Sequence, residues 1–421
     1  MTGLFFLFSL LFGWLAYNLF YPIYNNAKGA MLSFLAGWLT AELAMHHILW
    51  QVVLVSLFVM GGAVAGFFGA LGFLICVSAW IAMTYHYLLS EKAETEISDA
   101  LYDGLGEGHL DEIHEEFSSR FPVAPDFERI KWPFTGNDPK VEVIKNVPFG
   151  VNDQYLDIYR PREGVENAPV LFQIHGGAWT EKMGSKNEQA LPLMNHMALR
   201  NWICVSADYR LSPTATAPDH IVDCKQALVW IKQEISSYGG DPDFIVVTGG
   251  SAGGHLAALM ALSANDPTFQ SGFEGEDTSV QGAVPFYGAY DFTNENGFQR
   301  NDALTDLLKT SVMKLSRQEN MEAYRQSSPL FRVTGSAPPF LIIHGDKDTL
   351  VPVEEARLFA SRLRDVAENP VVYAEISGGQ HAFDMFESVR SEHVKHGVER
   401  FLGHTYSCFL DTSGQVNEAG A

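Results

Sequence analysis

FIVVTGGSAGGHLA, residues 244–257, is the stretch of the chain that decides its fold. Its first five residues are apolar or β-branched, which is typical of a buried strand, and its last residues favour a helix. Between them Gly249, Ser251 and Gly253 form the pattern G-x-S-x-G, which places a serine on a cramped turn between a strand and a helix. Such a turn exposes the hydroxyl and aims the helix amino terminus at negative charge developing beside it. The stretch therefore predicts that Ser251 is a nucleophile.

From about residue 141 the chain alternates short apolar runs with helix-like segments such as 219–236 and 253–263. The other apolar runs are PVLFQIH (169–175), WICVSADY (202–209), GAVPFYG (282–288), FLIIHG (340–345) and VVYAEI (371–376). Buried strands separated by helices predict an α/β fold, with a mostly parallel sheet covered on both faces. Active-site residues are then expected at the carboxyl ends of the strands.

A serine hydroxyl becomes a good nucleophile only when a base removes its proton. Among fourteen histidines, His381 follows the last strand-like run through the flexible turn SGGQ, so we predict that it is the base. A carboxylate must then orient the histidine and stabilise its cation. Asp346 and Asp348 both follow the run FLIIHG and either could serve; we choose Asp348 and interpret Asp346 as a turn former. The resulting order along the chain is Ser, Asp, His.

The segment HGGAW, residues 175–179, follows the strand-like run PVLFQI. Its glycines expose backbone N–H groups that can stabilise the oxyanion of a tetrahedral intermediate. We therefore predict an oxyanion hole made of the N–H groups of Gly176, Gly177 and Ala252. We interpret His175 as a structural residue of this loop.

The first ninety residues differ in character from the rest. Lys28 and Glu42 are their only formally charged side chains, so the net charge of −22 belongs almost entirely to residues 91–421. Residues 4–21 are long enough to cross the roughly 30 Å hydrocarbon core of a membrane, and the absence of a basic residue before Lys28 argues against a cleaved signal peptide. Residues 30–89 have the length of two or three further helices. We predict an integral membrane protein with three to four spans in residues 1–90.

The side of the membrane that holds the rest of the chain stays open, because Lys28 alone carries the charge signal. Glu42 and His46 lie one helical turn apart, so they form either a functional polar pair within lipid or solvated residues at an interface. We favour the solvated interpretation. The acidic remainder of the chain argues against a nucleic-acid partner.

Residues 91–140 are acidic and partly helical, and we interpret them as a juxtamembrane linker or cap. The catalytic domain is predicted over 141–405 and a C-terminal tail over 406–421. Within the domain, the helix-rich insertion 292–336 either covers the site and supplies an acyl pocket or is ordinary packing. The four cysteines form neither a CxxC pair nor a cluster with histidines, so no metal or disulfide framework is expected.

These motifs resemble those of the α/β-hydrolase superfamily, in particular the hormone-sensitive-lipase-like esterases. The resemblance covers roughly residues 145–402 and rests on HGGAW, DYRLSP (208–213), YGGDPDF (238–244), GGSAGGHLAAL (249–259), HGDKDTLVP (344–352) and QHAF (380–383). The chain is also similar to membrane-associated actinobacterial esterases, which join such a domain to amino-terminal membrane helices. It departs from the pattern at Gly250, where many relatives carry an acidic residue, and at Ala178, which replaces the third glycine of HGGG.

The resemblance implies hydrolysis of small to medium acyl esters, without a metal or organic cofactor. A membrane tether would favour lipophilic esters, because the bilayer concentrates them beside the site. Other functions stay open: an amidase, formamidase, peptidase or acyltransferase would use the same residues, a hydrolase-fold binding module would use none of them, and a transporter would place its function in the membrane part. The oligomeric state is not predicted.

Overall fold

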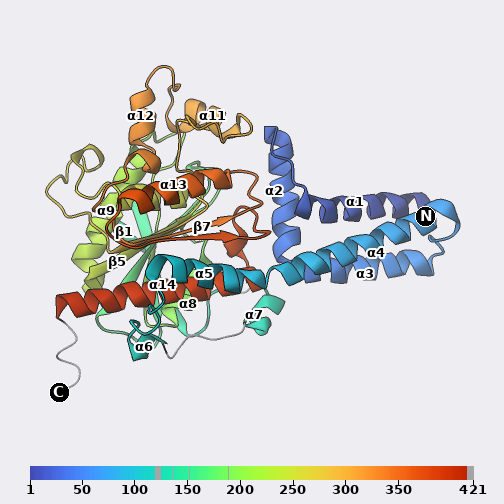
Figure 1. Cartoon of the computed structure of the whole chain (residues 1–421), viewed down its shortest axis with the longest axis horizontal. Coiled ribbons are helices and arrows are strands. Elements are labelled where there is room, and N and C mark those ends of the chain that lie inside the picture. The colour runs from blue at the N-terminus through green and yellow to red at the C-terminus, as the bar shows by residue number, and fades with distance from the viewer. Residues whose placement is uncertain (119–124, 135, 151, 188, 415–421) are drawn as a thin grey trace.

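The computed structural model describes residues 1–118, 125–134, 136–150, 152–187 and 189–414. Eight strands form one sheet in the order β1-β2-β4-β3-β5-β6-β7-β8 (Figure 1). β1 and β2 are antiparallel to their neighbours, whereas β3 to β8 run parallel to one another. The strands are β1 (Val141–Phe149), β2 (Gln154–Pro161), β3 (Ala168–Ile174), β4 (Ile203–Ala207), β5 (Gly240–Gly250), β6 (Gly282–Phe286), β7 (Phe340–Gly345) and β8 (Val371–Ile376). The predicted mostly parallel sheet is confirmed.

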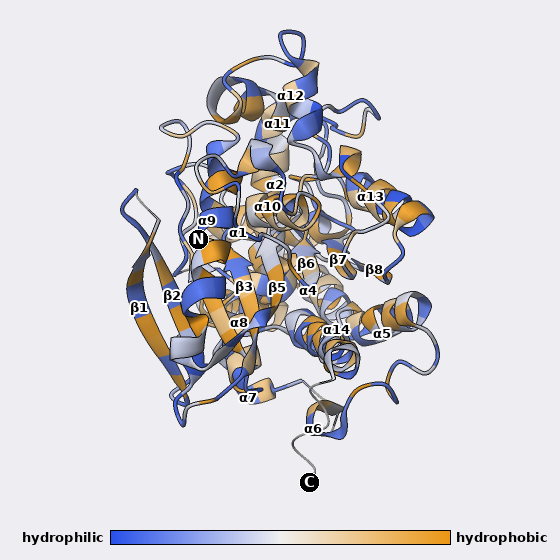
Figure 2. Cartoon of the chain, turned by 90° about the vertical axis from the view of Figure 1, so that its left-hand side faces the viewer, coloured by the Kyte–Doolittle hydropathy of each residue, from blue (hydrophilic) through white to orange (hydrophobic). Residues whose placement is uncertain are grey.

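Helices cover both faces of this sheet (Figure 1). One face packs on α9 (Asp219–Glu234), α10 (Ala252–Ala261) and α13 (Val353–Val366), and the other packs on α5 (Lys92–Leu105), α8 (Leu191–Ala198) and α14 (Val389–Ser413). Every residue of β3, β4, β6 and β7 is buried, which explains why these strands are continuous apolar runs in the sequence. Figure 2 shows apolar and polar residues alternating around α5 and α13, as expected of helices with one face on a core.

Among the described residues outside the amino-terminal region, four further α-helices are short. They are α6 (Glu115–Ser118), α7 (Phe127–Lys131), α11 (Ala303–Leu307) and α12 (Met321–Gln326). α11 continues into a π-helical turn, η3 (Leu308–Val312). These last three elements belong to the insertion between β6 and β7.

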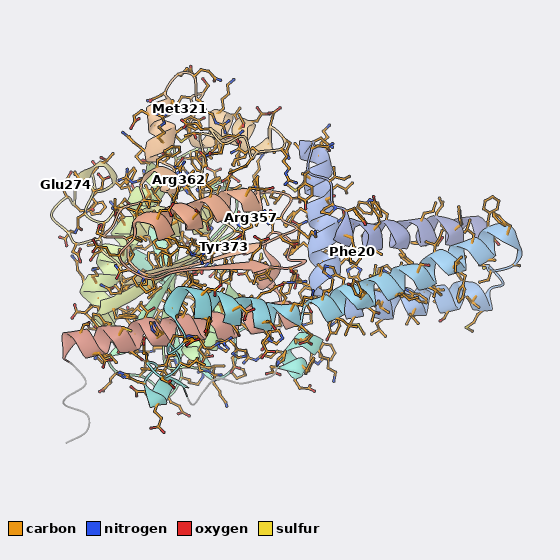
Figure 3. All side chains as sticks on the ribbon, viewed as in Figure 1. Phe20, Glu274, Met321, Arg357, Arg362 and Tyr373 are labelled. Atoms are coloured by element: carbon orange, nitrogen blue, oxygen red, sulfur yellow. The ribbon has the colours of Figure 1, made fainter. Side chains whose placement is uncertain are left out.

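The amino-terminal region contains α1 (Thr2–Phe20), α2 (Ala27–Glu42), α3 (Ala44–Met60) and α4 (Gly66–Leu89). Figure 1 shows α1, α3 and α4 side by side as a bundle, whereas α2 crosses its end next to the domain that contains the sheet. The chain bends by 92° between α2 and α3. Phe20, labelled in Figure 3 where the bundle meets α2, lies 5.8 Å from the His86 ring between centroids.

Among the described residues, two helical segments are long and apolar enough to cross a membrane, Thr2–Phe20 and Gly66–Leu105. The bent pair of α2 and α3 adds a third if it counts as one span. The structure thus offers two to three candidate spans where the sequence predicts three to four. The difference comes from α2, which is apolar but packs across the bundle.

Two of the predicted domain boundaries do not coincide with breaks in the structure. α5 lies within the interpreted linker, yet it packs on β8 and α14 with Ala93, Ile97 and Leu101 buried in the core. The interpreted tail begins at residue 406, but α14 continues to Ser413. The tail residues from 415 onward lie outside the described residues.

Candidate active site

Ser251 occupies the turn between β5 and α10, with φ 58° and ψ −119°. This positive φ is strained for a residue with a side chain and is maintained by the close packing around it. A Cβ on Gly253 would lie 2.0 Å from the Ile174 carbonyl oxygen, so only glycine lets β3 approach the turn this closely. The Ser251 N–H donates to the Phe286 carbonyl of β6 at 3.0 Å. The turn is thereby fixed to both strands that flank β5.

The structure brings the three predicted residues together in one hydrogen-bonded chain. His381 Nε2 lies 2.8 Å from Ser251 Oγ, and His381 Nδ1 lies 2.7 Å from Asp348 Oδ2. Asp348 follows β7 and His381 follows β8, the last two parallel strands of the sheet. Their loops therefore meet at the carboxyl end of the sheet, beside the serine.

The Asp348 carboxylate is buried and held in its charged form. Its Oδ1 accepts hydrogen bonds from the N–H groups of Leu350 and Val351, at 2.8 and 2.9 Å. Burial alone would raise the pKa of Asp348, but the nearby His381 charge and hydrogen bonds from His344 and His381 hold it well below its usual range. His344 Nε2 lies 3.2 Å from Asp348 Oδ2. The carboxylate can therefore stabilise a histidine cation at neutral pH.

Asp346, the alternative aspartate, lies elsewhere. Its Oδ1 accepts the N–H of Gly378 at 2.6 Å, which joins the loops after β7 and β8. The sequence suggested a turn former, whereas the Asp346 carboxylate makes a contact between two loops. A residue that the sequence did not single out, Gln380, completes the loop: its Oε1 accepts the N–H groups of His381 and Thr349, at 2.9 and 2.8 Å.

Comparison with known proteins shows which family the chain belongs to. The BD-FAE family model matches residues 156–363. The chain is 53% identical over 256 residues to the probable carboxylic ester hydrolase LipM of Mycobacterium tuberculosis, covering 60% of this chain and 58% of LipM. It is 38% identical over 296 residues to the esterase LipC of the same organism, covering 68% of this chain and 73% of LipC. The chain belongs to the hormone-sensitive-lipase-like α/β-hydrolases.

A solved member with this fold is a thermophilic esterase from Thermogutta terrifontis, determined with propionate bound. It aligns with a TM-score of 0.50 and 26% identity, over 67% of this chain and 97% of the esterase. The chain aligns with only 58% of the length of LipM. The alignments to LipM, LipC and the Thermogutta esterase cover between 60% and 68% of this chain.

The predicted oxyanion hole is only partly open. The Gly176 N–H donates to the side-chain oxygen of Gln189, so this predicted donor already has a partner. Ala178 and Ala252 line the cavity at Ser251. Gly177 has φ 108°, and a Cβ there would lie 1.6 Å from the Met183 carbonyl oxygen, so this position requires glycine. No signal in the sequence pointed to Gln189.

Gly250, where many members of the family carry an acidic residue, faces a tyrosine. A Cβ on Gly250 would lie 2.6 Å from the Tyr287 hydroxyl oxygen. That hydroxyl donates to Asp384, and the Tyr287 ring lies 4.7 Å from the His381 ring. Burial raises the pKa of both Tyr287 and Asp384. The Tyr287 hydroxyl, hydrogen-bonded to Asp384, thus occupies the space that an acidic side chain at position 250 would need.

A cavity of about 490 Å³ opens at the serine, a volume typical of small-molecule sites. Its lining includes Ser251 and His381 together with Trp179, Met183, Leu304 and Leu307. The insertion therefore contributes a wall through α11, whereas Leu308 and Val312 of the following turn are buried in the core. One part of the insertion thus lines the cavity, and another part packs in the core.

In the described part of the chain, two clusters of possible metal ligands combine residues of α14 with a residue from another segment, and neither includes Ser251. They are Glu112–His404–Cys408 and His196–His396–Glu399. In the second, the Glu399 carboxylate already pairs with His196 at 2.7 Å and with Arg200 at 2.6 Å. Ion pairing accounts for this cluster without a metal.

The structure contradicts the interpretation of Glu42 as a solvated residue. It was expected to be solvated or paired with His46, but its carboxylate is buried and pairs with Arg390, while Ser388 Oγ donates to it at 2.7 Å. His46 instead lies 3.2 Å from the Lys131 carbonyl oxygen. The reason is that α2 packs against the catalytic domain, where α14 supplies the opposite charge.

Proposed function

We propose that this protein is a membrane-anchored serine carboxylesterase that hydrolyses acyl esters through an acyl-enzyme on Ser251. The observation that carries this proposal is the hydrogen-bonded chain from Ser251 through His381 to Asp348, at the base of an apolar cavity. The names of LipM and LipC, a carboxylic ester hydrolase and an esterase, support the same reaction class.

In the first half of the reaction, His381 Nε2 takes the proton of Ser251 as Oγ attacks the ester carbonyl carbon. The imidazolium that forms is stabilised by the Asp348 carboxylate at 2.7 Å. The tetrahedral intermediate then collapses: the bond to the alcohol oxygen breaks, and His381 gives its proton to the leaving alcohol. The acyl group stays on Ser251 as an ester.

In the second half, a water molecule takes the place of the alcohol. His381 accepts its proton as the water oxygen attacks the acyl carbon, and the bond to Ser251 Oγ breaks as the proton returns to that oxygen. The carboxylic acid leaves and the serine is restored. Each half therefore uses the same base in both directions.

The negative charge on the carbonyl oxygen needs backbone donors in both halves. We assign this role to the N–H of Ala252, at the amino terminus of α10, and to the N–H groups of Gly177 and Ala178. Gly176 joins them only if Gln189 releases its N–H. One such donor contributes roughly 3 kcal/mol to stabilising the transition state.

Anchoring in the membrane is the second part of the proposal. The bundle of α1, α3 and α4 exposes large apolar side chains along its length, among them Leu7, Val53, Leu57, Phe67, Leu74 and Ile81. Exposed apolar surface of this extent is unfavourable in water and favourable in lipid. In this arrangement α1, α3 and α4 lie in the bilayer.

The proposal is tested with the full-length protein in detergent, by measuring hydrolysis of p-nitrophenyl acetate and butyrate beside Ser251→Ala. We expect turnover by the wild type and loss of measurable turnover in the variant. Equal activity in both proteins would contradict the mechanism. Flotation of the expressed protein with membranes after an alkaline carbonate wash tests the anchor, and release into the wash would contradict it.

A further inference from the structure

Helix α2 is attached directly to the loops that carry the catalytic residues. Trp38 Nε1 donates to the carbonyl oxygen of Ala382, next to His381, at 2.8 Å. The hydroxyl of Thr349, next to Asp348, donates to the Ala30 carbonyl oxygen of α2 at 3.0 Å. The helix therefore contacts the loop after β7 and the loop after β8 at the same time.

Two side chains of α2 reach the site itself. The Phe34 ring stands edge-on to the His381 ring, with 5.9 Å between centroids and 78° between planes. Phe34 is buried in the core cluster of the catalytic domain, not in that of the amino-terminal bundle. Met31, one turn earlier, lines the cavity at Ser251 together with Leu304 and Leu307 of α11.

The outward face of α2 is apolar as well. Leu32, Leu35 and Leu39 are 53%, 49% and 36% exposed, and Met31 is 40% exposed at the edge of the cavity. α2 lies at 92° to α3, so a bilayer crossed by α3 has α2 lying along its surface. The exposed leucines then face lipid, and Met31 sits between the lipid surface and the cavity.

We propose that α2 is a substrate-binding element, which forms the lipid-side wall of the acyl pocket. The inference rests on the proposed esterase function and names its substrate class: esters with a medium or long acyl chain that extends from Ser251 past Leu304 and Leu307 to Met31. An apolar chain is the chemistry that fits, because the residues that α2 and α11 contribute to the cavity lining are Met31, Ala303, Leu304 and Leu307. Such esters concentrate in the bilayer, next to this wall.

The test compares pocket-filling substitutions in the full-length protein in lipid nanodiscs. The quantity measured is the ratio of kcat/KM for p-nitrophenyl octanoate to that for p-nitrophenyl acetate, since only the longer chain reaches α2. Met31→Trp fills the α2 side of the cavity, and Leu307→Trp fills the α11 side. Leu32→Trp is the matched control, because Leu32 neighbours Met31 but does not line the cavity.

A tryptophan that excludes two methylenes of the chain should lower the ratio about tenfold. We expect this decrease in Met31→Trp and Leu307→Trp and an unchanged ratio in Leu32→Trp. A ratio unaltered by Met31→Trp would overturn the inference, whether or not Leu307→Trp lowers it, and so would an equal decrease in Leu32→Trp. Failure of the esterase function itself would be distinct, because the wild type would then hydrolyse neither ester.

Discussion

The buried ion pair between Glu42 of α2 and Arg390 of α14 provides a quantitative test of how α2 joins the catalytic domain. Their side chains are 0% and 1% exposed. Glu42→Gln keeps an oxygen for the Ser388 hydroxyl but leaves the Arg390 charge buried without its counter-charge. Removing one partner of a buried pair costs about 3–5 kcal/mol of unfolding free energy. With roughly 2–4 °C per kcal/mol for a domain of this size, the melting temperature should fall by about 6–20 °C.

The assay is thermal unfolding followed by intrinsic fluorescence, in one detergent and at one scan rate. A variant with both Glu42→Met and Arg390→Met carries no buried charge, so we expect it to be more stable than either single variant. Glu295→Gln is the control, because it breaks an exposed pair with Arg325 and should cost less than about 1 kcal/mol. A Glu42→Gln shift no larger than that of the control would refute the reasoning, as would a double variant less stable than both singles.

Three further predictions concern the site and its supports. Asp348→Asn should lower kcat for p-nitrophenyl butyrate about 10³- to 10⁴-fold, because the His381 cation loses its counter-charge; a change below tenfold would contradict the role given to Asp348. Tyr287→Phe leaves the half-buried Asp384 carboxyl without its donor and should reduce the free energy of unfolding by about 0.5–1.5 kcal/mol, whereas an unchanged melting temperature would show that the pair does not support the loop. Burial first, and the Asp291 charge second, raise the pKa of Glu355 from 4.5 to about 8. Its contribution to stability is therefore complete below pH 4.5 and lost as the pH rises to 8, so the melting temperature should fall less between pH 5 and pH 8 in Glu355→Gln than in the wild type; parallel pH profiles would contradict this.

Local sequence signals were sufficient to predict which side chains meet at Ser251. Ser251 lies in a pattern whose glycines are each required by close backbone packing, and Asp348 and His381 directly follow strands that the apolar runs identify. Because the carboxyl ends of parallel strands meet at one edge of the sheet, chain order alone placed these three residues near one another. The sheet itself was predictable for the same reason.

The position of α2 was not predictable from such signals. Hydropathy shows that the helix avoids water, but a protein core and a lipid bilayer are both apolar and give the same pattern. The contact that decides the question joins Glu42 to Arg390, which are 348 positions apart, and neither residue carries a local mark of the other. The Gly176–Gln189 and Tyr287–Asp384 hydrogen bonds were missed for the same reason, since each is a tertiary contact between segments of unremarkable composition.

We propose that His381 activates Ser251 as a nucleophile. The most direct test of this proposal is labelling of the full-length protein with a fluorophosphonate probe, followed by peptide mass spectrometry. We predict one probe adduct on the peptide that contains Ser251, with a labelling rate at least about 100-fold lower in His381→Ala, in line with the usual contribution of a general base. An adduct on another residue, or equal labelling rates in the two proteins, would contradict the claim.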